Sequence, residues 1–404
     1  MVKEAQENKS ATESAVSKFS HKYTPAVVAL SILIAAVSYV LGASAQAAVY
    51  RGLTLLVTSC PCAFAIAIPV SMVSSITGLA KQGVLVKGSR YIETVSKVTL
   101  VAFDKTGTLT KGSLRMRDVC VHSNLTSEDV LAIAASLEQK SEHPIAQAIL
   151  WEAGRQGLKL TDVSGFQVLP GMGVSGTISG VEHSAGNLRL LTARNIRLQI
   201  EEDHACGQGS LVYVFRGNEH LGTISLSDTA KDESRDVIEQ LKQMGIKTVI
   251  LTGDNPDSAH EIGLEVGITS IRADLMPEDK VTAVQQMATR DTVLMVGDGI
   301  NDAPALAVAD VSVAVGAVST DAAIEAADIA LMKDDLSLVP RLISKARRTM
   351  KTIRQNVTFA LMTKMIVAGL AMLGLAPLWF AIAAGDLGVT FAVVANAFRL
   401  SDAS

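Results

Sequence analysis

The stretch Leu100–Thr110, LVAFDKTGTLT, joins a short apolar run to a tight turn, and it decides the fold. The apolar run predicts a buried strand, Asp104 follows at its end, and Gly107 permits the chain to turn sharply. A carboxylate held at such a position can attack the γ-phosphorus of a nucleotide and carry the phosphoryl group as an acyl phosphate. The alternative for Asp-Lys-Thr alone is an ordinary junction in which the Asp caps the next segment.

Other apolar runs in the middle of the chain also end in Gly, Asp or Thr, with amphipathic stretches such as Lys231–Met244 and Pro277–Ala288 between them. The predicted strands are Val98–Phe103, Thr248–Leu251, Thr292–Val296 and Val311–Val315. Strands alternating with helices predict a parallel α/β sheet with ligands at the carboxyl ends of the strands. We therefore expect Asp104, Thr252-Gly253-Asp254 and Gly297-Asp298-Gly299 to surround one phosphate.

A phosphate in transfer requires cations and hydrogen-bond donors around it. Asp298 and Asp302, in GDGINDAPAL, supply hard oxygen ligands suited to Mg²⁺. Thr252 and Lys280 supply a hydroxyl and a positive charge for the phosphate oxygens. For Asp302 the alternative is a helix cap, and for Lys280 it is a solvated charge on a helix.

Four apolar runs predict a membrane part in two blocks: Thr24–Ala43, Gly52–Ile76, Val357–Leu375 and Leu378–Phe398. The second run is expected to be broken by Pro61, within Cys60-Pro61-Cys62, and by Pro69. A buried pair of soluble helices is the alternative for the last two. Lys and Arg flank the runs on the side of the long middle segment, whereas the short connections carry neither, so the positive-inside rule places both ends and the middle segment in the cytoplasm. The predicted divisions are a stalk segment 1–23, two spans in 24–79, a phosphorylation domain in 80–117 and 223–355, an inserted domain 118–222, and two spans in 356–404.

The composition of the 404-residue chain agrees with a membrane protein that carries soluble domains. Hydrophobic residues make up 49%, and a net charge of −4 argues against nucleic acid as the main partner. Four cysteines do not form a disulfide framework.

The heptapeptide DKTGTLT resembles the phosphorylation signature of the P-type ATPases. The resemblance implies a membrane α-helical bundle of four spans plus an α/β part, in which a haloacid-dehalogenase-like parallel-sheet phosphorylation domain carries an inserted α+β nucleotide-binding domain. It also implies a catalytic set and a magnesium set. The first is Asp104 as nucleophile with Lys105, Thr106, Thr252, Asp254 and Lys280; the second is Asp104, Thr106, Asp298 and Asp302.

Soluble phosphatases of the haloacid-dehalogenase class share the Asp nucleophile and the sheet, so they are an alternative. They usually carry a second Asp two residues after the first, where this chain has Thr106. This Thr favours a stable phosphoenzyme.

The inserted segment carries Ser141-Glu142-His143-Pro144, a Gly-x-Gly after Pro170, and a Gly-Asn pair. In this order they resemble the nucleotide-binding domain of the heavy-metal-transporting P-type ATPases. The resemblance implies that ATP is lined by Glu138, His143, Gly171, Gly173, Gly186 and Asn187.

Ion selectivity is expected at Ser59-Cys60-Pro61-Cys62, because Pro unwinds a helix and thiolates select soft metals. Packing of two small cysteines is the alternative. Lys364 and Asp386 are the charged residues of the last two spans, and charges in a bilayer usually serve function or pair with each other. Thiolates with a carboxylate, and a resemblance to the zinc/cadmium/lead branch, predict Zn²⁺, Cd²⁺ or Pb²⁺ as cargo bound by Cys60, Cys62 and Asp386. Lys364 is expected to neutralise Asp386 or the thiolates, with a purely structural ion pair as the alternative.

Complete members of the resembling family also carry amino-terminal metal-binding modules, earlier spans and an actuator domain with a Thr-Gly-Glu loop, and this sequence contains no Thr-Gly-Glu. We therefore expect an ATP-driven export pump of the plasma (inner) membrane that is incomplete or split. The chain is expected to be either a truncated product or a half whose actuator is supplied by a separate chain. A remnant that binds nucleotide and metal without efficient turnover is the alternative.

Overall fold

The computed structural model describes residues 10–59, 62–141, 143–193, 206, 210–299, 302–316, 325–372 and 377–402. The chain divides into two compact units, which are described separately. The first contains residues 1–101, 243–247 and 281–404, and the second contains residues 102–242 and 248–280.

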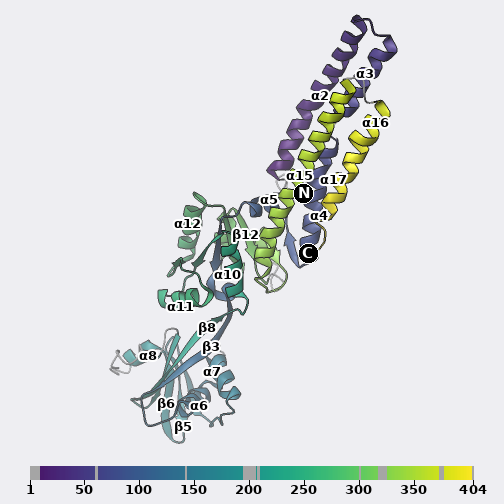
Figure 1. Cartoon of the computed structure of the whole chain (residues 1–404). Helices are drawn as coiled ribbons and strands as arrows, with labels where there is room; N and C mark the ends of the chain where they lie inside the picture. Colours follow the sequence, from purple (N-terminus) through teal and green to yellow (C-terminus); the bar gives the residue numbers. More distant parts are fainter. Residues whose placement is uncertain are drawn as a thin grey trace. The chain divides into compact units, whose positions relative to one another are not determined.

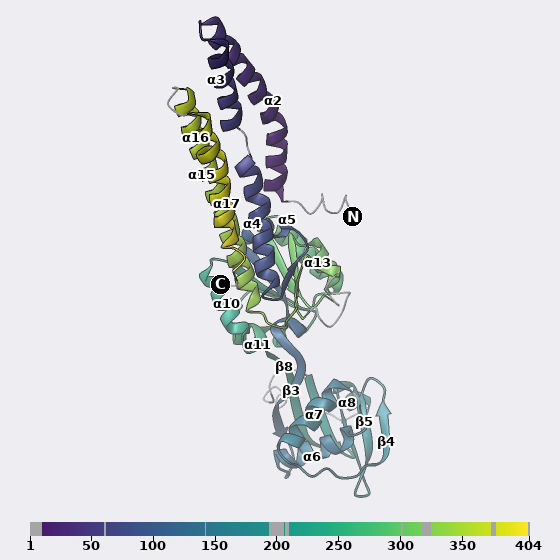
Figure 2. The same cartoon turned by 90° about the vertical axis from the view of Figure 1, so that its right-hand side faces the viewer.

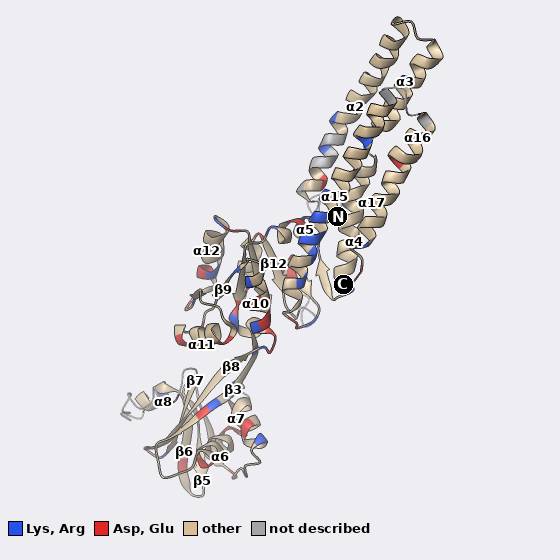
Figure 3. Ribbon diagram, in the orientation of Figure 1, with Lys and Arg blue, Asp and Glu red and all other residues tan. Residues whose placement is uncertain are grey.

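Long apolar helices dominate the first unit (Figures 1 and 2). They are α2 (Ala11–Val40), α3 (Ala45–Thr58), α4 (Cys62–Ala80), α15 (Leu338–Met372), α16 (Leu378–Ile382) and α17 (Val389–Phe398). Helix α2 packs on α3, whereas α4 packs on α15 and α17 around buried alanines and valines. Figure 3 shows few charged residues along α2, α3 and α17.

Within the described ranges, two helical segments are long and apolar enough to cross a membrane, His21–Val40 and Trp379–Phe398, and Ala65–Ala80 is a shorter apolar helix. Four such segments were expected. The run from Gly52 is divided between α3 and α4, because α3 ends at Thr58 and α4 begins at Cys62. The expected break at Pro69 is absent, since this residue lies inside α4.

Two further differences concern helix ends. Helix α2 begins well before Thr24 because Ser10 and Glu13 form a reciprocal capping box at its amino terminus. The last apolar run is not one regular helix, because the π-helical turn η4 (Ala383–Gly388) separates α16 from α17. Single π-helical turns within α-helices are frequently found at functional sites.

The first unit also contains strands and helices of the α/β part. Strands β1 (Val84–Val86), β13 (Ile329–Leu331), β12 (Val311–Ala314) and β11 (Val293–Gly297) lie in this order, with β1 antiparallel to β13 and the others parallel. Helices α5 (Ser89–Ser96) and α13 (Ala303–Val308) belong to the same unit.

The second unit contains the strand that leads to Asp104. Strand β2 (Leu100–Asp104) is buried throughout and is followed by the turn η1 (Lys105–Leu109). Strand β9 (Lys247–Leu251) pairs in parallel with β10 (Ile271–Arg272). Helices α10 (Ser234–Gln243) and α11 (Pro256–Val266) belong to this part, and α12 (Pro277–Ala288) begins in it and continues into the first unit.

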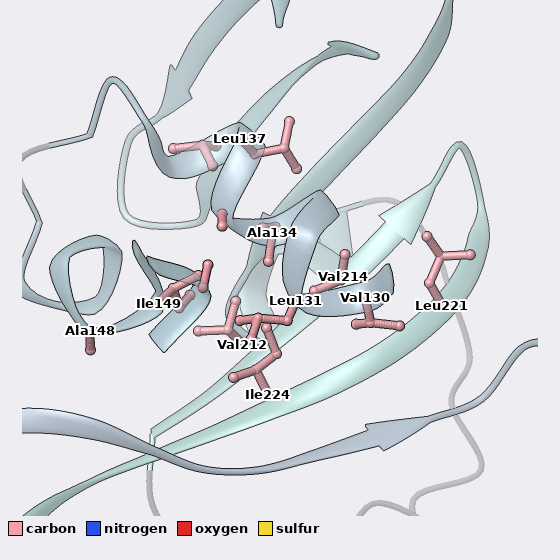
Figure 4. Packing of buried hydrophobic residues seen from close by; sticks show 14 of the residues in the cluster. Val130, Leu131, Ala134, Leu137, Ala148, Ile149, Val212, Val214, Leu221 and Ile224 are labelled. Carbon is pink, nitrogen blue, oxygen red and sulfur yellow. The ribbon is translucent and has the colours of Figure 1, made fainter. Parts of the chain in front are cut away.

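A six-stranded antiparallel sheet forms the inserted domain of the second unit. Its strand order is β3 (Thr110–Val121), β8 (Glu219–Ala230), β7 (Ser210–Arg216), β6 (Val181–Gly186), β5 (Gly173–Ile178) and β4 (Ser164–Leu169). Helices α6 (Ser127–Glu138) and α7 (Pro144–Arg155) pack on the sheet through an apolar core (Figure 4). A short helix, α8 (Leu188–Ala193), follows β6. The α/β fold class with an inserted α+β domain is therefore confirmed, and the chain enters and leaves the insertion through the long strands β3 and β8.

Candidate functional site

Asp104 lies at the carboxyl end of β2, and only 5% of its surface is exposed. The Nζ atom of Lys280, from the first turn of α12, lies 2.7 Å from Oδ1 of Asp104. The Lys280 side chain is 12% exposed, so its interpretation as a solvated helix charge is wrong. The ion pair places a positive charge beside the carboxylate that would receive a phosphoryl group.

Asp254, which follows β9, contacts two residues of the turn after Asp104. Its carboxylate forms an ion pair with Lys105 and accepts a hydrogen bond of 3.3 Å from Oγ1 of Thr106. The backbone N of Asp254 donates to Oγ1 of buried Thr252 at 3.1 Å, and Lys105 also donates to Oγ of Ser258 at 3.2 Å. The second unit therefore brings the DKTGT and TGD motifs together, as their places at strand ends predict.

The turn at Gly107 is held by residues that the sequence analysis did not select. Gly107 has φ +74°, a conformation that glycine adopts without strain, and its carbonyl accepts a hydrogen bond of 3.1 Å from Nζ of Lys231. The hydroxyl of Thr110 donates to the carboxylate of buried Asp228 on β8. The sequence did offer a signal for them, since Asp228 and Lys231 are ionisable residues at the end of β8, the strand that returns from the insertion. The chain must leave the insertion beside its point of entry, so these residues were candidates to contact the turn after Asp104.

Asp298 and Asp302 belong to the first unit. Asp298 follows β11, and Asp302, which is 1% exposed, occupies the residue before α13 without capping it through its side chain. A Cβ atom on Gly297 would lie 3.0 Å from Oδ2 of Asp302, so glycine makes room for this carboxylate. A helix-cap role does not account for Asp302, and its proposed role as a magnesium ligand remains a prediction.

The inserted domain contains a cavity of about 230 Å³. All six residues predicted to contact ATP line it: Glu138, His143, Gly171, Gly173, Gly186 and Asn187. The remaining wall includes the apolar side chains of Leu169, Met172 and Val212. A concave, mostly apolar site with a few polar groups has the general character of a small-molecule site.

Close backbone contacts shape the cavity. A Cβ atom on Gly173 would lie 2.1 Å from the carbonyl O of Ala185, and one on Gly186 would lie 2.0 Å from that of Met172. Asn187 joins the same wall, because its Nδ2 donates to the carbonyl O of Gly171 at 3.1 Å. Any side chain at Gly173 or Gly186 would overlap these carbonyl groups, so the close approach of the two backbone segments requires glycine at both positions.

The two ionisable residues of the cavity differ in their hydrogen bonding. His143 caps α7, and its Nδ1 accepts a hydrogen bond of 3.2 Å from the backbone N of Ile145. Glu138 is 5% exposed, and its buried Oε2 has no hydrogen-bond partner among the residues that the structure describes. Burial raises the pKa of the Glu138 carboxyl from its ordinary value of 4.5, and a hydrogen bond from Ser141 partly opposes this effect. An unpaired carboxylate oxygen in a cavity wall is suited to a ligand that donates a hydrogen bond.

Replacing Glu138 by Gln is expected to stabilise the inserted domain at pH 8 and to have little effect near pH 4.5. The folded domain holds the Glu138 proton to higher pH than the unfolded chain does, so this carboxyl lowers stability as the pH rises through its folded pKa. Thermal unfolding can be followed by the fluorescence of Trp151 on α7 in a Trp379→Phe background. An equal shift of the melting temperature at both pH values would contradict this cause.

In the helical bundle, Nζ of Lys364 on α15 lies 3.1 Å from Oδ1 of Asp386 on η4. A Cβ atom on Gly385 would lie 3.2 Å from Val367, so glycine permits the turn to approach α15 closely. Lys364 and Asp386 therefore pair, and a structural ion pair remains the alternative to a metal-site role.

Cys62 is the first residue of α4, and Cys60 lies outside the described residues. Among the residues that the structure describes, no group of three or more His, Cys, Asp or Glu side chains is placed to hold a metal ion. The cargo site Cys60, Cys62 and Asp386 therefore stays a prediction.

Comparisons with known proteins agree with this architecture. Residues 98–310 match the family of haloacid dehalogenase-like hydrolases. The chain is 40% identical over 99% of its length to the cadmium-transporting ATPase of Staphylococcus aureus, of which it covers 56%. It is 39% identical over 99% of its length to the zinc/cadmium/lead-transporting P-type ATPase of Escherichia coli, of which it covers 54%. The chain thus spans about half the length of these relatives.

A crystal structure of a zinc-transporting PIB-type ATPase in the E2.Pi state is similar to 95% of this chain, with a TM-score of 0.85 and 39% identity, and the match covers 63% of that chain. The likeness thus includes the helical bundle as well as the hydrolase-like part. The chain therefore belongs to the haloacid dehalogenase-like hydrolases.

Proposed function

We propose that this chain forms the catalytic and membrane part of a pump that exports Zn²⁺, Cd²⁺ or Pb²⁺ at the expense of ATP. The observation that carries the proposal is the buried Asp104, paired with Lys280 at a strand end where Lys105, Thr106 and Asp254 meet. The names of the relatives support the choice of cargo, since they include cadmium-transporting and zinc/cadmium/lead-transporting ATPases.

In the proposed reaction, a carboxylate oxygen of Asp104 attacks the γ-phosphorus of ATP, and the bond to the bridging oxygen breaks to release ADP. Lys280 neutralises charge beside the acceptor oxygen, and Lys105 and Thr252 present a cation and a hydroxyl. The residues suited to Mg²⁺ are Asp104, Thr106, Asp298 and Asp302, because carboxylate and hydroxyl oxygens are hard ligands. Bound Mg²⁺ would supply charge neutralisation for the phosphate oxygens.

The cavity of the inserted domain is proposed to hold the adenine part of ATP. Support comes from its six predicted lining residues, from its apolar wall, and from the unpaired Oε2 of Glu138. The ring of His143, fixed at the start of α7, offers a flat surface on which a base can stack.

The proposal further places the chain in the plasma (inner) membrane, with the catalytic parts in the cytoplasm where ATP is present. Arg341, Lys345, Arg347 and Arg348 precede the apolar part of α15, which supports this orientation. Nothing in the comparisons supports a separate chain that supplies the actuator.

Labelling with γ-phosphate-labelled ATP tests the proposed reaction. Incubation of the full chain with Mg²⁺ is expected to give protein-bound label that survives acid and is removed by hydroxylamine, as an acyl phosphate requires. Chelation of Mg²⁺ is expected to reduce the label to background. Label that resists hydroxylamine would contradict the carboxylate chemistry and favour a phosphorylated hydroxyl.

A further inference from the structure

The wall of the cavity in the inserted domain is suited to a base and unsuited to phosphate groups. Among the described residues that line it there is no lysine or arginine, and its ionisable residues are Glu138 and His143. The phosphate groups of a nucleotide carry several negative charges, which an ionised Glu138 would repel and an apolar wall would leave without solvation. A nucleotide whose base occupies the cavity must therefore place its phosphate groups outside the mouth, where a cation would stabilise them.

Exposed residues of the wall show where the cavity reaches the surface. Gly171 and Asn187 are exposed, whereas Val174 and Gly186, which also line the cavity, are buried. Gly171 has φ +70° and belongs to the turn after β4, and Asn187 immediately precedes α8. The cavity thus opens to solvent between the turn after β4 and the start of α8.

Arg189, in the first turn of α8, lies at this opening. A Cβ atom on Gly171 would lie 3.9 Å from Nη1 of Arg189, so the guanidinium is beside this glycine. Asn187 fixes the arrangement, because its Oδ1 accepts a hydrogen bond of 3.0 Å from the backbone N of Arg189 and its Nδ2 donates to the carbonyl O of Gly171 at 3.1 Å. Arg189 is exposed, so a ligand in the mouth of the cavity can reach its guanidinium.

We propose that Arg189 binds the phosphate groups of the nucleotide whose base occupies the cavity, and that it thereby gives the inserted domain a preference for phosphorylated nucleotides over the nucleoside. The inference rests on the proposed function, which places adenine in this cavity. A guanidinium presents N–H groups in one plane and can donate two parallel hydrogen bonds to the oxygens of one phosphate. The ammonium of a lysine carries the same charge but acts as a point charge.

The proposed task of Arg189 differs from that of Lys105 and Lys280. Those two lysines belong to the site around Asp104, where Lys280 pairs with the carboxylate that would receive the phosphoryl group. Arg189 contributes to affinity before any transfer takes place. Its substitution should therefore weaken binding only for ligands that carry phosphate.

The test measures equilibrium binding to the full chain in detergent by titration calorimetry, with adenosine, AMP, ADP and a non-hydrolysable ATP analogue as ligands. Arg189→Gln removes the charge and keeps a polar side chain, whereas Arg189→Lys keeps the charge without the planar group. Arg216→Gln is the matched control, because it makes the same change on a half-exposed side chain of the same domain. Arg216 pairs with Glu219 at 2.9 Å and lines no part of the cavity.

We expect Arg189→Gln to bind ADP and the ATP analogue roughly tenfold or more weakly, because a hydrogen bond between two charged groups is among the stronger ones. Its affinity for adenosine should equal that of the unmodified chain. The shortest ligand whose affinity falls identifies the phosphate that Arg189 contacts. Arg189→Lys should recover part of the lost affinity, and Arg216→Gln should bind every ligand like the unmodified chain.

Equal affinities of Arg189→Gln and the unmodified chain for ADP and the ATP analogue would overturn the inference and leave the proposed function intact. An equal loss for adenosine and ADP would also overturn it, since Arg189 would then only support the shape of the cavity. If the unmodified chain binds none of these ligands, the proposed nucleotide cavity is wrong and the role of Arg189 is refuted with it. Because binding is measured without phosphoryl transfer, failure of Asp104 to accept label would not affect this result.

Discussion

An Asp104→Asn variant of the full chain is expected to lose the hydroxylamine-labile label from ATP completely, down to the background of the assay. Asn keeps the size of the side chain, but its amide cannot form the acyl phosphate with ATP. The substitution also removes the negative partner of Lys280, which lies 2.7 Å from Oδ1 of Asp104. The measurement is acid-stable radioactivity per mole of protein at equal expression.

Asp232→Asn is the matched control for this variant, because it makes the same chemical change on a side chain that is 91% exposed and pairs with Lys111 at the surface. It should label like the unmodified chain, since a surface ion pair contributes little to stability. Binding of a non-hydrolysable ATP analogue should persist in Asp104→Asn, because the cavity proposed to hold the adenine lies in the inserted domain. Retention of hydroxylamine-labile label in Asp104→Asn would remove this residue from the reaction.

Removal of the intramembrane carboxylate is expected to have the second largest effect. In Asp386→Ala, the affinity of the full chain for Zn²⁺ or Cd²⁺ should fall by about 100-fold or more, since even the loss of a group that only supports a metal ligand typically costs about 10–100-fold. The proposed cargo site would keep only thiolate ligands. Equilibrium dialysis of the purified chain against labelled Cd²⁺ measures the effect.

The ion pair complicates this variant, because Lys364 would be left buried with an uncompensated charge, which is strongly destabilising. A Lys364→Met/Asp386→Ala double variant removes both charges and keeps the test valid if the single variant misfolds. Lys364→Met alone should retain metal binding, because it removes the competing cation and leaves the carboxylate. If Cu(I) binds more tightly than Cd²⁺ and neither substitution changes its affinity, the carboxylate is not a ligand and the cargo is monovalent.

The strand ends around Asp104 illustrate how far the sequence predicts the site. Apolar runs that stop at Asp104 and at Thr252 predict two parallel strands, and parallel strands bring their carboxyl ends to one edge of a sheet. The contacts of Asp254 with Lys105 and Thr106 follow from that arrangement. The expected grouping of Asp298 with these residues stays a prediction.

The membrane part was harder to predict from local patterns. Hydropathy located the apolar runs, but it gave no indication that η4 interrupts the last run around Asp386 or that α4 continues through Pro69. A proline inside a helix loses one backbone hydrogen bond, and neighbouring packed helices determine whether the helix nevertheless continues. Such packing is absent from any window of sequence.

The sequence by itself predicted the fold class, because strand periodicity is a local property of the chain. The resemblance of its motifs to a known family supplied the six residues that line the cavity, and the role of Asp104 as nucleophile stays a prediction. Only the tertiary structure decided that Lys280 pairs with Asp104, that Lys231 and Asp228 hold the turn after it, and that Cys120 meets Cys206. Each of these contacts joins residues far apart in sequence. Their distances depend on how helices and strands pack, and a pattern of neighbouring residues does not encode that packing.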